Sequence, residues 1–288
     1  MPPSGDKYEY LLNSSYGDLG DGAQIVIGNN NVYNYRTRTI KSGDRLELEI
    51  FPIWRTQSEH RAARQNASRE AQKKLNERNA IRTLTRKVDT NFTDKDYHAT
   101  LTYDARGELP DEKQARRDTQ NYFRRIKHFR KGQALPPLKY VNVMEFYNKD
   151  MRRTRVHHHV IMSGGVDRQV LKSLWGHGRV FIEELQPENG TLEGLVRYIT
   201  KQPGKHTHSK RWTASRNLKP PKITTANKKV SKKHTERLAA DVINEAPAIF
   251  TKLHKDYSFD KCTVKGSEFV SGVYIYATMY KTKTRKRE

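Results

Sequence analysis

The sequence predicts an α+β fold, with a central antiparallel sheet of the ferredoxin-like (RRM-like) type, helices packed on that sheet, and N- and C-terminal extensions. Between residues 97 and 204, segments with strand alternation and segments with helical spacing follow one another in the order β-α-β-β-α-β-α. The first six elements form the ferredoxin-like succession, in which two helices lie on one face of an antiparallel sheet. The length of 288 residues fits one large domain, or a domain with extensions.

The elements of this succession are recognised from apolar periodicity and from the residues that begin and end them. Turns rich in Gly, Pro and Asn separate the strands, and Asp or Thr stands before the two later helices as a candidate N-cap. In chain order we predict a strand at 97–104, a helix at 111–131, a hairpin of strands at 139–146 and 155–162, a helix at 167–175, a strand at 179–185 and a helix at 192–202.

The segments outside this core are predicted from composition. Residues 1–38 are rich in Asn, Gly, Asp and Tyr with little periodicity, so we expect a flexible tail. Residues 39–96 contain the alternating strand RLELEIFPIW and then a long basic helix from His60, and they should flank the core at 97–204. Residues 205–288 should form a basic extension, packed on the core and ending in the strand VYIYATMY.

The charge of the chain indicates a polyanionic partner. Lys and Arg number 55 against 32 Asp and Glu, which gives a formal net charge of +23, far more than solubility requires. No run of about 18 apolar residues is present, so nucleic acid is favoured over a membrane. Cys262 is the only cysteine, which excludes a disulfide framework or a cysteine zinc cluster within one chain. With no signal peptide in the sequence, we expect a cytoplasmic protein.

Three consecutive histidines in the predicted strand RVHHHVIM are sorted by strand alternation. His157 and His159 share one face, whereas His158 lies on the other face among apolar residues. Glu145 ends the preceding strand, so the hairpin offers two imidazoles and one carboxylate. Three such ligands leave coordination positions open for substrate oxygen, as a catalytic divalent ion requires. The alternative is a chance His-x-His pair, which is common in strands.

Tyr198 and Lys201 lie one turn apart on the last predicted helix and should point to the same volume. A tyrosine hydroxyl attacks a phosphodiester only when a metal polarises the phosphate and a cation stabilises the developing charge. Tyrosine at a helix edge is ordinarily a packing residue, so only the histidine and glutamate set favours a chemical role.

Residues 194–235 contain twelve Lys or Arg and no acidic residue, which predicts a track for a phosphodiester backbone rather than a merely solvated surface. A second His-x-His pair, His206 and His208, has no apolar or acidic neighbours and is interpreted as a loop near DNA. No G-x-x-x-x-G-K-[ST] phosphate loop is present, so a helicase motor is not expected. The candidate DNA-binding residues are Thr100, Thr102, Arg197, Lys205, Lys210, Arg211, Trp212, Arg216 and Lys219.

The motifs LTYD (101–104), His157 to His159 and Tyr198-x-x-Lys201, in this order and spacing, resemble those of the HUH endonucleases. The resemblance is to the single-tyrosine rolling-circle replication initiators of bacterial phages and small plasmids. His158 departs from the usual apolar residue in the middle of the histidine motif. Supporting resemblance extends through KYVNVMEF, LKSLWGHGRV and KRWTASRNLKPP, over about half of the chain or more.

The resemblance implies the HUH endonuclease fold and an enzyme that nicks one strand of an origin through Tyr198, stays joined to the 5′ phosphate and later religates the ends. Glu145, His157 and His159 would hold Mg²⁺ or Mn²⁺, and Lys201 would assist the tyrosine. The implied partners are single-stranded or cruciform origin DNA and a host polymerase and helicase, for a monomer or transient dimer with no membrane association.

Other functions remain open from the sequence. A single-tyrosine transposase or a relaxase uses similar metal and tyrosine chemistry. A repressor on the same fold would bind the origin without nicking it. A structural RNA-binding protein would use exposed aromatic residues on the sheet face, where this sequence offers His, Glu and Thr.

Overall fold

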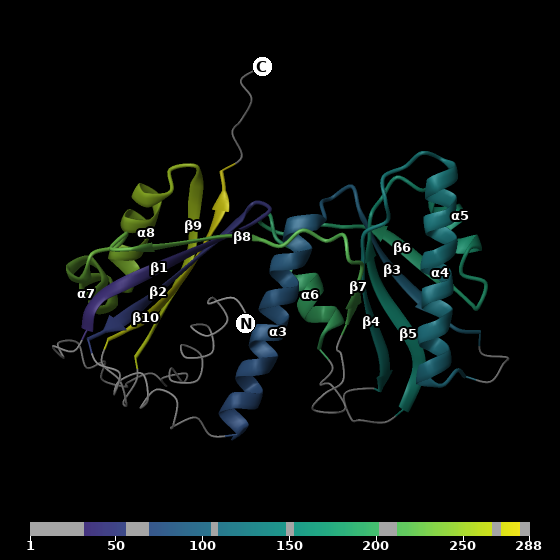
Figure 1. The fold of residues 1–288 in the computed structure, drawn as a ribbon, viewed down its shortest axis with the longest axis horizontal. Helices are drawn as coiled ribbons and strands as arrows, with labels where there is room; N and C mark the ends of the chain where they lie inside the picture. Colours follow the sequence, from purple (N-terminus) through teal and green to yellow (C-terminus); the bar gives the residue numbers. More distant parts are fainter. Residues whose placement is uncertain are drawn as a thin grey trace, which may run out of the picture. The chain divides into compact units, whose positions relative to one another are not determined.

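The computed structural model describes residues 32–55, 69–104, 109–147, 153–201, 212–266 and 272–282. The chain divides into two compact units, one formed by Met1–Thr83 with Pro221–Glu288 and the other by Leu84–Pro220. Each unit contains a five-stranded antiparallel sheet (Figure 1). Most of the expected N-terminal flank and C-terminal extension therefore fold together as a unit with its own sheet.

The second unit contains the predicted β-α-β-β-α-β-α succession, and the α+β fold class is confirmed. The strand order is β6-β3-β5-β4-β7, with all neighbours antiparallel, and its first four strands have the ferredoxin-like order. The short edge strand β7 was not predicted. The elements are β3 (Tyr97–Thr102), α4 (Glu112–Gly132), β4 (Tyr140–Tyr147), β5 (Arg153–Met162), α5 (Arg168–Ser173), β6 (Val180–Glu184), α6 (Glu193–Ile199) and β7 (Thr213–Ala214).

Helices α4 and α5 cover one face of this sheet (Figure 1). Each begins at an aspartate N-cap: Asp111 accepts from the Gln114 N–H at 2.6 Å, and Asp167 accepts from the backbone of the first turn of α5. Apolar side chains of both helices pack on the apolar face of the strands, and the buried Trp175 donates its indole N–H to the Thr102 carbonyl at 2.8 Å. The polar face of the strands is thus turned away from α4 and α5.

Helix α6 lies on the opposite face of the sheet, with Val196 and Ile199 buried (Figure 1). Its start is held by Asp89 near the end of α3 (Arg69–Asn91), which accepts from the Thr191 hydroxyl at 2.7 Å and from the Leu192 N–H at 2.8 Å. The helix ends at Ile199, so the predicted helix at 192–202 was too long. Lys201 consequently lies just beyond the helix.

The first unit has the strand order β8-β1-β2-β10-β9, and its apolar core gathers side chains of β2, β10, α7 and α8. Residues 32–38, which we expected in a flexible tail, instead form the first part of β1. Only β2 and β10 were predicted here, and the basic helix expected from His60 is described from Arg69. The elements are β1 (Val32–Ser42), β2 (Arg45–Trp54), β8 (Lys222–Asn227), α7 (Lys232–Ala240), α8 (Val242–Leu253), β9 (Tyr257–Lys265) and β10 (Tyr274–Lys281).

Both faces of β2 are buried, including the face that carries its charged residues. The alternating pattern predicted the strand but not the burial of these charged side chains. Glu47 and Glu49 have no exposed surface. Arg45 lies 3.2 Å from Glu47, Arg38 lies 3.4 Å from Glu49, and the Tyr276 hydroxyl donates to Glu47 at 2.7 Å. Buried carboxylates of this kind require such partners, because an unpaired charge in the interior is strongly unfavourable.

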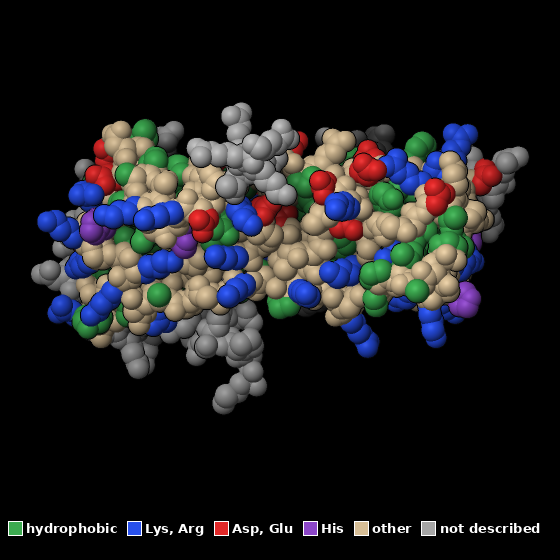
Figure 2. Space-filling model, turned by 90° about the horizontal axis from the view of Figure 1, so that it is seen from above, with side chains coloured by type: hydrophobic (Ala, Val, Ile, Leu, Met, Phe, Trp, Pro, Cys, Tyr) green, Lys and Arg blue, Asp and Glu red, His purple; other side chains and the backbone are tan. Residues whose placement is uncertain are grey.

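Lys and Arg side chains are dispersed over the face seen in Figure 2, with acidic side chains among them. On this face the positive charge is spread over the surface and does not form a single continuous patch. None of the described helices is both long and apolar enough to cross a membrane.

Gly164, directly after β5, gives a test of the packing of the second unit. A Cβ built on Gly164 would lie 2.0 Å from the Lys95 carbonyl oxygen, whereas one on Gly132, at the end of α4, meets nothing within 4 Å. The Gly164 N–H also donates to Asp96 at 2.9 Å, and its carbonyl accepts from Arg130 at 2.7 Å. Gly164→Ala should lower the free energy of unfolding by about 1–3 kcal/mol, measured by urea denaturation. Gly132→Ala is the control and should be neutral, and equal losses in both variants would contradict the expected steric constraint.

Candidate active site

The register of the central strand brings the predicted site residues together. Strand β5 pairs with β4 on one side and β3 on the other, so that His157 lies opposite Glu145 and Thr102, and His159 lies opposite Val143 and Thr100. Directly opposite residues of antiparallel strands project on the same face with Cβ atoms about 5 Å apart. The carboxylate and the two imidazoles therefore meet on the sheet face that α4 and α5 leave uncovered.

Glu145, His157 and His159 form a compact donor set. The Glu145 Oε2 atom lies 3.1 Å from His157 Nε2 and 3.5 Å from His159 Nε2, and one donor atom from each residue lies within 4.8 Å of the others. His159 is buried, whereas Glu145 and His157 are partly exposed. The mixed nitrogen and oxygen donors fit a divalent ion and leave the solvent side open to a further ligand.

Burial keeps His159 neutral. Desolvation, followed by the neighbouring His157 and His98, lowers the pKa of His159 to about 4, against the opposing effect of Glu145. A neutral imidazole has a free lone pair, which is the form that binds a metal. His159 is therefore available as a ligand at neutral pH.

His158 lies on the opposite face, as strand alternation predicts. It has no exposed surface, and burial lowers its pKa to about 3. The His158 Nε2 atom lies 3.3 Å from the Tyr103 hydroxyl, which itself donates to Asp118 at 3.2 Å. His158 Nδ1 has no hydrogen-bond partner among the described residues. This histidine contacts the core and the Tyr103 of the LTYD motif, and it points away from the donor set.

Tyr198 lies beside the donor set. Its ring centroid is 5.5 Å from that of His159 at an interplanar angle of 77°, and 51% of its surface is exposed. The ammonium group of Lys201 lies 4.4 Å from the centroid of the Tyr198 ring. A tyrosine, a cation and three candidate metal donors thus lie close together, although Lys201 follows the end of α6.

The candidate DNA-binding residues differ in how freely their side chains could contact DNA. The Thr102 hydroxyl donates to the Arg179 carbonyl at 3.0 Å, and the Arg197 guanidinium makes two hydrogen bonds to Glu193 at 2.8 and 2.5 Å. Lys205, Lys210 and Arg211 lie outside the described residues. The remaining candidates are Thr100, which lies 3.5 Å from His159 Nδ1, the half-buried Trp212, and the exposed Arg216 and Lys219.

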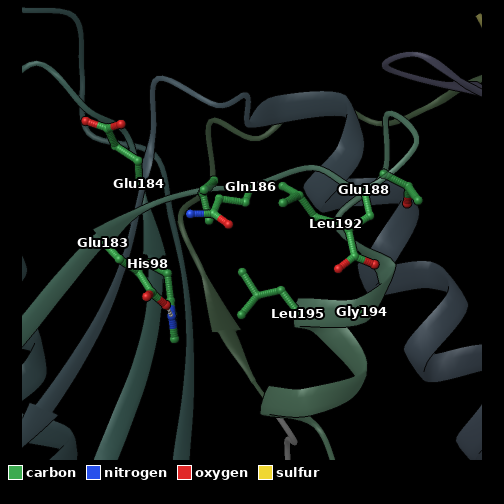
Figure 3. A pocket seen from close by; sticks show the side chains of 10 residues that line it. His98, Glu183, Glu184, Gln186, Glu188, Leu192, Gly194 and Leu195 are labelled. Carbon is green, nitrogen blue, oxygen red and sulfur yellow. Dashed lines mark hydrogen bonds and ion pairs between the residues drawn. The ribbon is translucent and has the colours of Figure 1, made fainter.

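Two residues of this region were not predicted as part of the site. His98 Nε2 lies 3.3 Å from His159 Nδ1, and His98 Nδ1 lies 2.8 Å from Glu183 Oε1. Both line a pocket of about 200 Å³ between β3, β6 and the start of α6 (Figure 3). Strand alternation places His98 on the same face as Thr100 and Thr102, and that was the available signal for His98. The pairing with Glu183 depends on the register of β6 against β3, which places Glu183 directly opposite His98 and which the sequence does not fix.

Comparison with known proteins gives one family. Residues 96–203 match the family model REP_ORF2-G2P, replication-associated protein ORF2/G2P. The matched segment, which is less than half of the chain, contains the three candidate metal donors, Tyr198 and Lys201, and the match indicates similarity to replication-associated proteins. No curated protein and no solved structure matches the chain significantly.

Metal binding is the first property to test. Saturating Mn²⁺ should stabilise the folded protein by about 2–3 kcal/mol, because an ion that binds only the native state adds its binding free energy to folding. The rise in melting temperature should vanish in Glu145→Gln and His157→Ala. His128→Ala, which removes an exposed histidine of α4, should keep the full rise. A melting temperature of the wild-type protein that does not change with Mn²⁺ would contradict the prediction that these residues bind a metal.

His158 should affect stability and not metal binding. His158→Ala removes a fully buried ring and a partner of the Tyr103 hydroxyl, so the free energy of unfolding should fall by about 2 kcal/mol or more. The stabilisation by Mn²⁺ should persist in this variant. Unchanged stability together with lost metal binding would mean that β5 has the opposite register.

Proposed function

We propose that this protein is a replication initiation endonuclease that nicks one DNA strand at an origin. Attack by Tyr198 would form a 5′-phosphotyrosine link and leave a 3′-hydroxyl that primes rolling-circle replication, and the reverse transfer would religate the ends. One observation carries the proposal: the exposed Tyr198 lies edge to face against His159, one of three clustered metal donors. The similarity of residues 96–203 to replication-associated proteins supports it.

The chemistry is a transfer of one phosphodiester. The Tyr198 oxygen attacks phosphorus, a new O–P bond forms, and the bond from phosphorus to the 3′ oxygen breaks. The leaving 3′ oxygen takes the electron pair of that bond and a proton equivalent to the one that tyrosine loses. Because one ester replaces another, the bond energy is kept for religation.

The neighbouring side chains favour this transfer. Glu145, His157 and His159 would hold Mg²⁺ or Mn²⁺, which when bound supplies positive charge that polarises the scissile phosphate. The ammonium of Lys201, close to the Tyr198 ring, favours the approach of a phosphate. The exposure of Tyr198 lets a backbone phosphate reach its hydroxyl without movement of the sheet.

The proposed DNA partner is single-stranded or cruciform origin DNA, as the resemblance to rolling-circle initiators implies. The net charge of +23 favours binding of any phosphodiester, and exposed Arg216 and Lys219 are candidate phosphate contacts. A host polymerase would extend the 3′-hydroxyl, and a host helicase would separate the strands. With one tyrosine in the motif, a second subunit of a transient dimer or a DNA hydroxyl would supply the second attack.

Single-tyrosine transposases and relaxases would use the same arrangement, and the match to a replication-associated family favours an initiator over them. A repressor without activity would give no reason for an exposed tyrosine beside three metal donors. The covalent adduct separates these classes.

The adduct assay uses single-stranded oligonucleotides tiled over the DNA element that encodes the protein, with Mn²⁺, and detects protein–DNA links that survive denaturing electrophoresis. Tyr198→Phe should reduce adduct formation at least about 100-fold, since the attacking oxygen is gone. Tyr33→Phe removes another exposed tyrosine hydroxyl, in the first unit, and should leave the adduct unchanged. Equal adduct from Tyr198→Phe would refute the nucleophile, and binding without adduct in the wild type would favour a repressor.

A further inference from the structure

A third histidine stands directly behind the metal donor set. His98, in β3, is 6% exposed and lies between His159 and Glu183. Its Nε2 atom is 3.3 Å from His159 Nδ1, and its Nδ1 atom is 2.8 Å from Glu183 Oε1 in β6. Figure 3 shows His98 and Glu183 facing each other at the wall of the pocket. Each nitrogen of His98 therefore has a polar neighbour.

The contact between the two histidines has the geometry of a hydrogen bond. Their ring centroids are 5.5 Å apart, although the closest nitrogens are only 3.3 Å apart, and the ring planes differ by 16°. Rings stacked face to face would bring the centroids much closer together. His98 and His159 instead meet edge to edge in nearly one plane, which aligns an N–H of one ring with the lone pair of the other.

Metal binding at His159 fixes the direction of these hydrogen bonds. His159 Nε2 faces Glu145, and with a metal held by both residues this nitrogen would offer its lone pair, so that the ring proton of a neutral His159 would reside on Nδ1. That proton is donated to His98 Nε2, which leaves the proton of His98 on its Nδ1. An ionised carboxylate only accepts hydrogen bonds, and Glu183 is in place to accept this one. One tautomer of each ring satisfies every contact.

We propose that Glu183 and His98 form a positioning relay that holds the tautomer and the ring orientation of His159. The proposal rests on the proposed metal site and adds two residues to it. A carboxylate bonded to the distal nitrogen of a ligand histidine commonly has this role, and here one imidazole is inserted between the carboxylate and the ligand. His98 and Glu183 are positioning residues, because neither belongs to the candidate donor set and both act through His159.

The Thr100 hydroxyl is a second candidate partner for His159 Nδ1, besides the imidazole of His98. Thr100 Oγ1 lies 3.5 Å from His159 Nδ1, at the long limit of a hydrogen bond, whereas His98 is closer. Because Glu183 is exposed, it can be replaced with little effect on packing, whereas His98 is buried. Glu183 is thus the better probe, and Glu184 offers a neighbouring glutamate that pairs instead with Arg168 at 2.6 Å.

The test measures Mn²⁺ affinity of the full chain without DNA, by the electron paramagnetic resonance signal of the unbound ion. Glu183→Ala should weaken binding by about 10-fold and His98→Ala by up to about 100-fold, whereas Glu184→Ala should bind as the wild type does.

Long-range ¹H–¹⁵N spectra of the histidines give a second readout. In the metal-free protein, where Glu145 could instead accept from His159 Nε2, His159 should be the Nδ1–H tautomer in the wild type and a mixture of tautomers in Glu183→Ala, which a loss of stability alone would not produce.

The outcomes separate the relay from the metal site. If the wild type binds Mn²⁺ through His157 and both Glu183→Ala and His98→Ala bind equally well, the relay is wrong and the metal site stands. If Thr100→Val weakens binding and Glu183→Ala does not, the threonine hydroxyl orients His159 and the relay is again refuted. If wild-type binding is absent or independent of His157, the proposed metal site fails and the relay fails with it.

Discussion

The antiparallel register of β5 between β3 and β4 is the constraint on which the candidate site depends. A shift by one residue would exchange the faces of the strand, so that His158 would face Glu145 while His157 and His159 entered the core. Apolar side chains of β5 pack with α4 and α5 on one face, and this packing opposes such a shift. The helices that stabilise the sheet therefore also determine which imidazoles face the uncovered side.

His159 and Tyr198 lie in contact but differ in burial: His159 is buried, whereas Tyr198 is half exposed. His159 is enclosed, and desolvation holds it neutral even though Glu145, which favours a proton on it, lies within 3.5 Å. Tyr198 is half exposed and can meet a polymer that never enters the protein. A buried candidate ligand next to an accessible tyrosine suits the proposed chemistry on a DNA backbone, because the substrate would remain outside while the polar groups of the site are fixed inside.

The sequence predicted most of the second unit because β3, β4, β5 and β6 each have one apolar face and are bounded by turn residues, whereas the two-residue β7 has no such pattern. Strand alternation alone assigned His157 and His159 to one face and His158 to the other. It failed for residues 32–38, because this part of β1 buries polar side chains such as Asn34, Thr37 and Arg38 as well as apolar ones, so that no polar face marks it as a strand. The pairing of His98 with Glu183 was also out of reach, since it depends on two strands that are adjacent in space and 85 positions apart in sequence.

The position of Tyr198 depends on contacts that are equally remote in sequence. Helix α6 is only seven residues long, and a helix of two turns is not stable by itself. Asp89, about a hundred residues earlier, binds the Thr191 hydroxyl and the Leu192 N–H at its start, and the burial of Val196 and Ile199 fixes its rotation. The sheet register thus sets the metal donors, while the end of α3 and the packing of α6 set the tyrosine. The candidate metal donors and Tyr198 are therefore positioned by different parts of the chain, and they meet at the contact between His159 and Tyr198.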